Sequence, residues 1–449
     1  GLAYAFFYMG RYNLTVAKRS LGDDLMSNMD FGAIFGIGAL VYGISFLFTG
    51  PLTDKMGGRR AMLLGAAGTI LANFMMGLAL YGMTYWGWTF SVPLAFGILY
   101  ALNMHFQSYG AIAIVTVKAP WFHIRERGRF STIFGWMISL GIFFAFDWGG
   151  AIAKATRAVL PENLGFWATT FQTILGSGGT GVDQNWWLFF FPSILIGICW
   201  ILMFFWLKNS PGDAGYKDFD TGEESVSATG ERLPISQVYL KIITHPILLI
   251  VCLIEFCSGI LRNGIMHWYY LFAGKVGFKK DFLITDNWGL SLLLAGVVGA
   301  IMTGWFSDKF FQSRRAPMAA ILYIVMLLCT TLMAFTLDLN PWYAGGAAIV
   351  ISMAVIGVHG ILSGTSTADF AGTKNAGAAT GIVDGMVYLG TGIQSFIIPL
   401  LIPSGDSEEA KVAFNYQWWP VFLIPFTIIG AGLCIKIWNA LPKAKPKTA

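Results

Sequence analysis

Two arginines lie inside hydrophobic stretches of this chain, where a membrane-spanning helix would carry each of them into the bilayer. Arg11 lies in LAYAFFYMGRYNLTVA, and Arg262 lies in LLIVCLIEFCSGILRNGIMHWYY. An arginine at the centre of such a helix costs roughly 2.5–3.5 kcal/mol, so it needs an anion, a polar partner or an aqueous cavity. The alternative is that the long side chains reach the lipid headgroups. Arg262, however, is about 15 Å from the end of its apolar stretch near Phe272. We therefore predict that the pair binds an anion.

Three carboxylates also lie inside hydrophobic stretches of the chain. Glu255 precedes Arg262 by seven residues and lies on the same helix face, which predicts either an ion pair with that arginine in the empty site or a proton carrier. Asp384 lies one turn before Tyr388, which indicates a carboxylate role at the cytoplasmic half of the same cavity. Asp147 is expected nearer the outer surface, where a solvated helix end explains it as well as a function does.

The remaining polar groups give weaker signals. His359 is expected to be a hydrogen-bonded packing group, whereas His105 and Gln107 would line the cavity from a neighbouring helix. The sequence contains no GxSxG, Walker or HExxH motif, and its five cysteines lack metal-ligand spacing. We therefore predict that the protein is not an enzyme and holds no metal or cofactor.

The composition is that of a membrane protein, with 56% hydrophobic residues, 12% charged residues and a mean hydropathy of +0.63. Apolar runs long enough to span a bilayer recur along the whole sequence. We predict an all-α integral membrane protein with twelve spans, at 1–17, 31–53, 61–83, 89–118, 130–155, 187–207, 246–272, 288–306, 317–337, 342–366, 378–402 and 418–440.

A polar stretch divides these spans into two groups of six. We predict an N-terminal bundle at 1–207, a central cytoplasmic loop at 208–243 and a C-terminal bundle at 244–449. The two halves repeat, because Asp54 and Asp308 are 254 residues apart and Arg11 and Arg262 are 251 residues apart. Parallel repeats of this kind place a transport site at the midplane between them, so the two arginines should face each other.

The loops after even-numbered spans carry most of the basic residues, which places them in the cytoplasm. The net charge of +5 thus reflects membrane orientation and gives no argument for nucleic acid. In two of these loops an aspartate precedes arginines, as Asp54 precedes Arg59 and Asp308 precedes Arg314. Such groups can pair with the next helix terminus and form a latch that one conformation makes and another breaks. The orientation rule explains the arginines but neither aspartate.

Both loops share one motif. Its residues are Gly50, Leu52, Asp54, Lys55, Gly57, Arg59 and Arg60 in the first loop and Gly304, Asp308 and Lys309 in the second. This motif resembles the loop signature of the major facilitator superfamily. Further motifs are Tyr8-x-x-Arg11-x-Asn13, Tyr42-Gly43-x-Ser45, Trp121-Phe-His-Ile-Arg125-Glu126-Arg127-Gly128, Leu261-Arg262-x-Gly264-Ile265-x-x-Trp268, Gly304-Trp-x-Ser-Asp308-Lys309 and Tyr388-Leu389-Gly390. They resemble the organophosphate:phosphate antiporter family, which includes bacterial glycerol-3-phosphate and hexose-phosphate transporters.

The resemblance implies that Arg11 and Arg262 bind a substrate phosphate, with Tyr8, Tyr42 and Tyr388 nearby in the cavity. Arginine suits this task because its planar fork of donors matches phosphate oxygens.

Three positions depart from the family pattern. Phe46 replaces a lysine, Ile138 aligns with a histidine of the glycerol-3-phosphate type, and His267 replaces an aspartate. The cavity should therefore be less basic and more apolar than in those relatives.

These features together predict a monomeric secondary transporter in a bacterial inner membrane, surrounded by lipid. It would exchange a phosphorylated organic anion for inorganic phosphate by alternating access. Two alternatives stay open: proton-coupled transport of another anion, with Glu255, Asp384 or Asp147 as the carrier, and a transporter-like receptor for a sugar phosphate.

Overall fold

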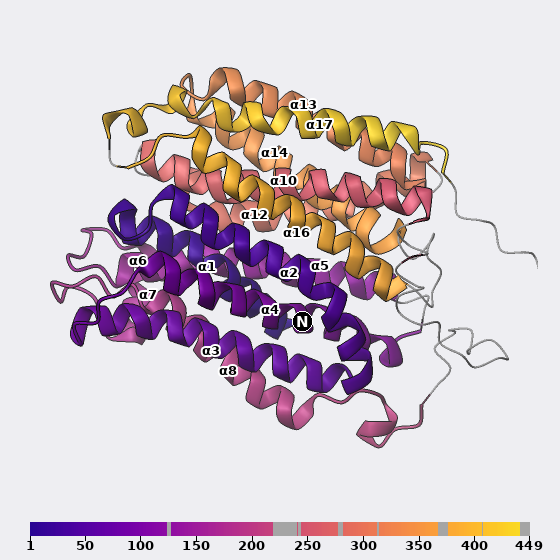
Figure 1. Cartoon of the computed structure of the whole chain (residues 1–449), viewed down its shortest axis with the longest axis horizontal. Coiled ribbons are helices and arrows are strands. Elements are labelled where there is room, and N and C mark those ends of the chain that lie inside the picture. Colours follow the sequence, from indigo (N-terminus) through magenta and orange to yellow (C-terminus); the bar gives the residue numbers. More distant parts are fainter. Residues whose placement is uncertain are drawn as a thin grey trace, which may run out of the picture.

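The computed structural model describes residues 1–123, 127–218, 240, 244–276, 282–311, 314–366, 376–405 and 407–440. Across these residues the regular secondary structure is helical. Figure 1 shows two helical bundles lying side by side, the N-terminal one in indigo to magenta and the C-terminal one in orange to yellow.

The helices of the N-terminal bundle follow one another in chain order. They are α1 (Leu2–Leu25), α2 (Asn28–Met56), α3 (Gly58–Tyr85), α4 (Val92–Lys118), the short η1 (Ala119–Trp121), α5 (Arg127–Phe143), the π-helical η2 (Phe144–Trp148), α6 (Gly149–Ala155), α7 (Gly165–Leu175), α8 (Trp187–Trp206) and η3 (Gly212–Ala214). The elements α5, η2 and α6 follow without a break, so together they occupy one predicted span.

The C-terminal bundle is built in the same way. Its elements are α10 (Pro246–Val276), the short α11 (Leu283–Asp286), α12 (Trp288–Phe311), α13 (Arg315–Thr336), α14 (Pro341–His359), the π-helical η4 (Gly360–Ser366), α16 (Ala376–Leu401), η6 (Glu408–Lys411), η7 (Ala413–Tyr416) and α17 (Trp418–Lys436).

Every predicted span corresponds to a helix, and the all-α membrane fold is confirmed. Among the described residues, ten helical segments are long and apolar enough to cross a membrane. The two other predicted spans, α1 and α4, fold into long helices with more polar residues. These two helices carry Arg11 and Gln107, which lie together in the site described below.

Close approaches between helices set the position of the site. In the C-terminal bundle α10 packs against α16, and a Cβ on Gly259 would lie only 1.9 Å from the carbonyl oxygen of Val387. Between the bundles α2 packs against α16, and a Cβ on Gly43 would lie 2.9 Å from the carbonyl oxygen of Gly385. Helices that lack side chains at such points can approach closely in a membrane. Another contact between the bundles joins α5 to α12.

Candidate anion-binding site

Arg11 lies at the centre of the molecule, fully buried on α1. Its Nε donates a hydrogen bond to Oε1 of Gln107 at 2.8 Å, and its Nη1 donates to the Tyr388 hydroxyl at 2.5 Å. Its Nη2 is buried and has no hydrogen-bond partner among the described residues. Because Tyr388 belongs to α16, this arginine links the two bundles and still presents a free donor.

Aromatic rings surround the guanidinium group. The Cζ atom of Arg11 lies 4.6 Å from the ring centre of Tyr8, 4.4 Å from that of Tyr42 and 5.5 Å from that of Tyr388. The rings of Tyr42 and Tyr388 are 4.3 Å apart, and Phe46 lies 4.7 Å from Tyr42. The quadrupoles of these rings stabilise the cation without supplying a negative charge.

Polar groups of α4 hold α1 in place beside these rings. Gln107 donates to the backbone carbonyl of Phe7 at 3.1 Å, and Asn103 donates to that of Gly10 at 3.0 Å. The Tyr100 hydroxyl donates to the carbonyl of Arg11 itself at 3.0 Å. The polar residues of α4 thus fix the helix that carries the arginine.

Arg262 lies on α10 of the other bundle and is only partly buried. Its Nε is buried and has no hydrogen-bond partner among the described residues. The Tyr8 hydroxyl interacts with Arg262, and Tyr8 also packs on Arg11, so it lies between the two arginines. In the described part of the chain no ion pair involves either arginine. Each guanidinium therefore has donors available for an anion.

Glu255 does not pair with Arg262, the partner that the sequence suggested. Its Oε2 lies 3.1 Å from Nδ1 of His359, and Nε2 of His359 lies 4.0 Å from Oδ1 of Asp384. The Ser363 hydroxyl donates to the same oxygen of Asp384. His359 was expected to be a hydrogen-bonded packing group, and it is hydrogen-bonded to Glu255, but the sequence did not predict that it lies between two carboxylates. No local sequence pattern predicts this contact, because His359 and Glu255 are 104 residues apart.

His267 is buried where α1 and α10 meet. Its Nδ1 lies 2.7 Å from the Thr15 hydroxyl and its Nε2 lies 3.2 Å from Oδ1 of Asn263. Its ring also packs 4.3 Å from that of Phe35. Both nitrogens therefore have protein partners, and the residue joins the two bundles.

Further polar contacts join the bundles at one end of the molecule, which we call the sealed end. There Asp147 accepts hydrogen bonds from the backbone nitrogens of Gly289 and Leu290, at 2.7 and 2.9 Å, at the start of α12. Asp23 of one bundle pairs with Lys275 of the other. Asn28 donates across the interface to the carbonyl of Pro403 at 3.1 Å. At the opposite end, no hydrogen bond or ion pair joins the bundles among the described residues.

That opposite end carries the repeated loop motif. Asp308 pairs with Arg315 at 2.8 Å, while Arg314 donates to the carbonyl of Phe311 at 3.3 Å. Arg59 donates to the carbonyl of Phe204 at 2.5 Å, at the end of α8. These contacts stay within one bundle. The side chain of Asp54 lies outside the described part of the structure, as do Arg125, Glu126 and residues 219–239 of the central loop.

The family model of the Major Facilitator Superfamily matches residues 1–395. The chain belongs to this superfamily. This family and the transporter names of its relatives point to a membrane transporter family rather than to an enzyme.

Several curated relatives match this superfamily member over nearly its whole length. The membrane sensor protein UhpC of Salmonella typhimurium is 25% identical and is matched over 96% of this chain and 87% of the relative. The glycerol-3-phosphate transporter of Bacillus subtilis is 24% identical and is matched over 99% of this chain and 92% of the relative. A probable hexose phosphate transport protein of Chlamydia trachomatis is 23% identical, over 98% and 89%. These relatives support membership of the organophosphate:phosphate antiporter family.

Solved structures show the same fold. An inward-facing, unoccupied bacterial homologue of the human lysosomal transporter Spinster superposes with a TM-score of 0.73 at 14% identity, over 99% of this chain and 97% of that one. The outward-facing transporter FucP superposes with a TM-score of 0.59 at 12% identity, over 96% of this chain and 97% of that one. At these identities the likeness concerns the fold alone.

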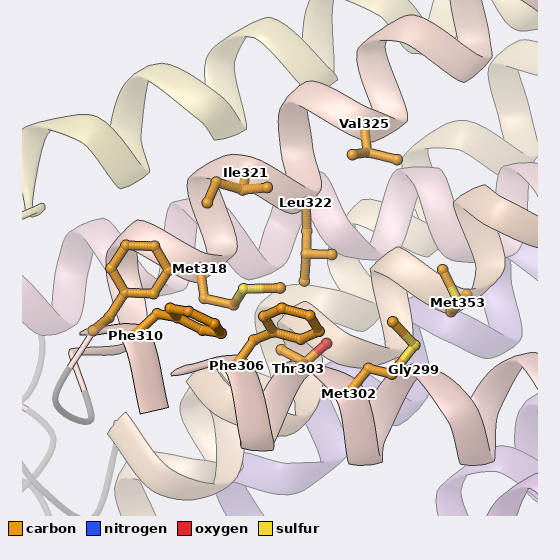
Figure 2. Close-up of a pocket in the computed structure, with 11 residues that line it drawn as sticks. Gly299, Met302, Thr303, Phe306, Phe310, Met318, Ile321, Leu322, Val325 and Met353 are labelled. Atoms are coloured by element: carbon orange, nitrogen blue, oxygen red, sulfur yellow. The ribbon is translucent and has the colours of Figure 1, made fainter. Parts of the chain in front are cut away.

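An apolar pocket in the C-terminal bundle is separate from the arginines. It has a volume of about 590 Å³ and lies between α12, α13 and α14. Figure 2 shows its lining of Phe306, Met318, Leu322 and Met353, with Thr303 as the labelled side chain that bears an oxygen. A phosphate would find no charged partner among the residues that line it.

Proposed function

We propose that this protein is a secondary transporter of a phosphorylated organic anion, which it exchanges for inorganic phosphate. One observation carries the proposal: Arg11 and Arg262, from different bundles, both have unpartnered guanidinium nitrogens and no carboxylate partner among the described residues. A buried cation without a counter-charge is costly, and an anion removes that cost. The relatives named for hexose phosphate and glycerol-3-phosphate transport support the same substrate class.

The chemistry of the site fits phosphate. Two guanidinium groups neutralise a dianion, and their planar forks match phosphate oxygens. Tyr388 accepts a hydrogen bond from Arg11, so an arriving phosphate oxygen has only a neutral hydroxyl to displace. The rings of Tyr42 and Phe46 form an apolar wall, which suits an organic group better than a second charge.

Exchange follows from the charges. Without an anion the two arginines repel each other across the bundle interface, and a bridging dianion removes this repulsion and lowers the barrier between the two conformations. Because basic loops lie in the cytoplasm, we place the sealed end on the outer side. In this orientation, the hydrogen bonds and ion pair of the sealed end would lie on the outer side, and the repeated loop motif would lie on the cytoplasmic side.

The decisive experiment measures uptake of labelled phosphate into proteoliposomes preloaded with unlabelled phosphate. Arg11→Lys and Arg262→Lys keep the charge but lose the fork, so each should reduce exchange at least about tenfold. Arg60→Lys is the matched control, because Arg60 is exposed in the first turn of α3, and this variant should exchange normally. Exchange within a few-fold of the wild type in either site variant would contradict the proposed site.

The same experiment tests the receptor alternative, which the relationship to the sensor protein UhpC keeps open. A receptor would bind phosphate compounds without flux. Phosphate binding in detergent together with no counterflow in proteoliposomes would therefore favour a sensor over a transporter.

A further inference from the structure

Three titratable residues of the C-terminal bundle form what we call the acid–histidine cluster: Glu255 of α10, His359 at the end of α14 and Asp384 of α16. His359 lies between the two carboxylates, at 3.1 Å and 4.0 Å. The side chain of Glu255 is fully buried, whereas those of His359 and Asp384 are 29% and 28% exposed. The Oε1 atom of Glu255 is buried and has no partner among the described residues.

The charge of this cluster follows from burial. A buried carboxylate stays ionised only beside a cation, and His359 is the group positioned to provide one. Glu255 and His359 therefore share one proton, either as an ion pair or as two neutral groups, and their sum is zero in both cases. Asp384 then carries the remaining negative charge of the cluster.

The elements around the cluster add one permanent charge. The titratable and charged groups that interact with its members from α1, α10, α13 and α17 are Tyr8, Cys252, Arg262, Tyr323 and Cys434. Arg262 is the cation among them that acts on both His359 and Asp384. The cluster thus senses whether the charge of Arg262 is neutralised.

The cluster lies close to the anion site but outside direct reach of a phosphate held there. Asp384 is one helical turn from Tyr388, and Glu255 is two turns from Arg262, which correspond to about 6 Å and about 10 Å along the helix axes. At such distances in a low-dielectric interior, charges still interact by more than thermal energy.

We propose that the acid–histidine cluster takes up a proton when the anion binds, so that the protein carries an anion and a proton together. A bound dianion neutralises the two arginines. The net charge of the site is then minus one, because Asp384 is still ionised. A proton from solvent that binds the Asp384 carboxylate brings the sum to zero, and it leaves again when the anion leaves. This inference rests on the proposed arginine site and adds a second, coupled ligand to it.

The test is calorimetric binding of inorganic phosphate to the purified protein, at several pH values and in buffers of different ionisation enthalpy. The wild type should take up one more proton per phosphate than Asp384→Asn. For each unit fall in pH, the phosphate affinity of the wild type should rise by up to about tenfold more than that of Asp384→Asn. Uptake of one linked proton sets this limit. The titration of phosphate itself cancels in this comparison. Asp213→Asn, in the short exposed η3, is the matched control and should behave as the wild type.

Equal proton uptake and equal pH dependence in wild type and Asp384→Asn would overturn the proposal. If that variant instead changes the preference among phosphomonoesters at constant pH dependence, the cluster is a subsite for the organic group and the proposal fails. Infrared difference spectroscopy of the wild type needs no variant: phosphate binding should produce a carboxylic acid band, and its absence is also a refutation. Failure of the wild type to bind phosphate at all would remove the arginine site as well.

Discussion

At the scale of single residues, the arginine site is stabilised by aromatic rings and neutral hydrogen-bond acceptors. Arg11 is held by three tyrosine rings and by Gln107. Such desolvated cation–π contacts contribute up to about 2 kcal/mol or more. An ion pair would leave a buried, unpaired carboxylate behind when the substrate bound to the arginine, whereas a ring or a hydroxyl leaves no charge. The empty site is therefore stable and still ready for an anion.

Phe46 is the residue where a change of selectivity is easiest to test. It is buried against Tyr42, beside the arginine. Phe46→Lys adds a cation and removes part of the apolar wall, so it should strengthen binding of inorganic phosphate about tenfold and weaken bulkier organophosphates. Competition binding on the purified protein measures both. Phe166→Lys, 76% exposed on α7 and outside the candidate membrane spans, should change neither, and an unaltered or inverted preference in Phe46→Lys would mean that this residue does not contact substrate.

The sequence foretold some of these neighbours and missed others. Tyr8 and Arg11 are close in sequence, and the resemblance to a known family grouped them with Tyr42 and Tyr388; the structure brings all four together. Their function stays a prediction. The role of His359 was not visible, because a lone histidine among small residues looks alike whether it packs or bridges carboxylates.

At the scale of helices, the spacing between α10 and α16 sets the distance between Arg262 and Tyr388. Gly259 lies one turn before Arg262, and Val387 adjoins Tyr388. A Cβ on Gly259 would lie 1.9 Å from the carbonyl oxygen of Val387, so the helices must separate to accommodate it.

We expect Gly259→Ala to destabilise the protein by about 1–3 kcal/mol, as overpacking does in tightly packed interiors. Phosphate affinity should fall with it, because Arg262 moves relative to Tyr388. Thermal unfolding and phosphate binding measure the two effects. Gly432→Ala is the control, since a Cβ there has no atom within 4 Å. A Gly259→Ala protein with unchanged stability and affinity would show that the two helices separate freely.

The helices were predicted correctly where a long apolar run is enough to identify a membrane span. Long apolar runs located the spans, as for 31–53 against the observed Asn28–Met56. Helix α7 (Gly165–Leu175) was missed because it is short and threonines and a glutamine interrupt its apolar residues. The π-helical turns of η2 and η4 were also missed, since a change of hydrogen-bond register leaves no hydrophobic pattern.

At the scale of the whole molecule, the bundles are joined at one end by polar contacts that water could replace. One of these contacts depends on a single side chain. The carboxylate of Asp147 accepts two backbone hydrogen bonds at the first turn of α12. A carboxylate is favoured at a helix N-terminus by the helix dipole as well. The contact therefore holds one bundle to the start of a helix in the other.

Asp147→Ala should shift the protein toward the conformation that is open at the sealed end. Two backbone N–H groups would lose their acceptor, which costs about 1–3 kcal/mol and corresponds to a roughly 5- to 150-fold change in the ratio of states. Spin labels at the exposed positions Val159 and Leu283 would report a longer distance. Asp183→Ala is a matched control, because Asp183 accepts from the backbone of Ala158 within one bundle. Distances unchanged by Asp147→Ala would mean that apolar packing alone keeps this end shut.

The two arginines differ in exposure, and this difference has a consequence for the time course of binding. Arg262 is partly exposed, whereas Arg11 is fully covered and hydrogen-bonded to Tyr388. An arriving anion therefore meets Arg262 first, in an encounter whose rate grows with concentration. Arg11 can offer its free Nη2, but bidentate capture must wait for Tyr388 to release Nη1, at a rate that concentration cannot raise. Rapid mixing should thus resolve a fast phase followed by a slower one that reaches a plateau, and that plateau sets the upper limit on how quickly the carrier can load.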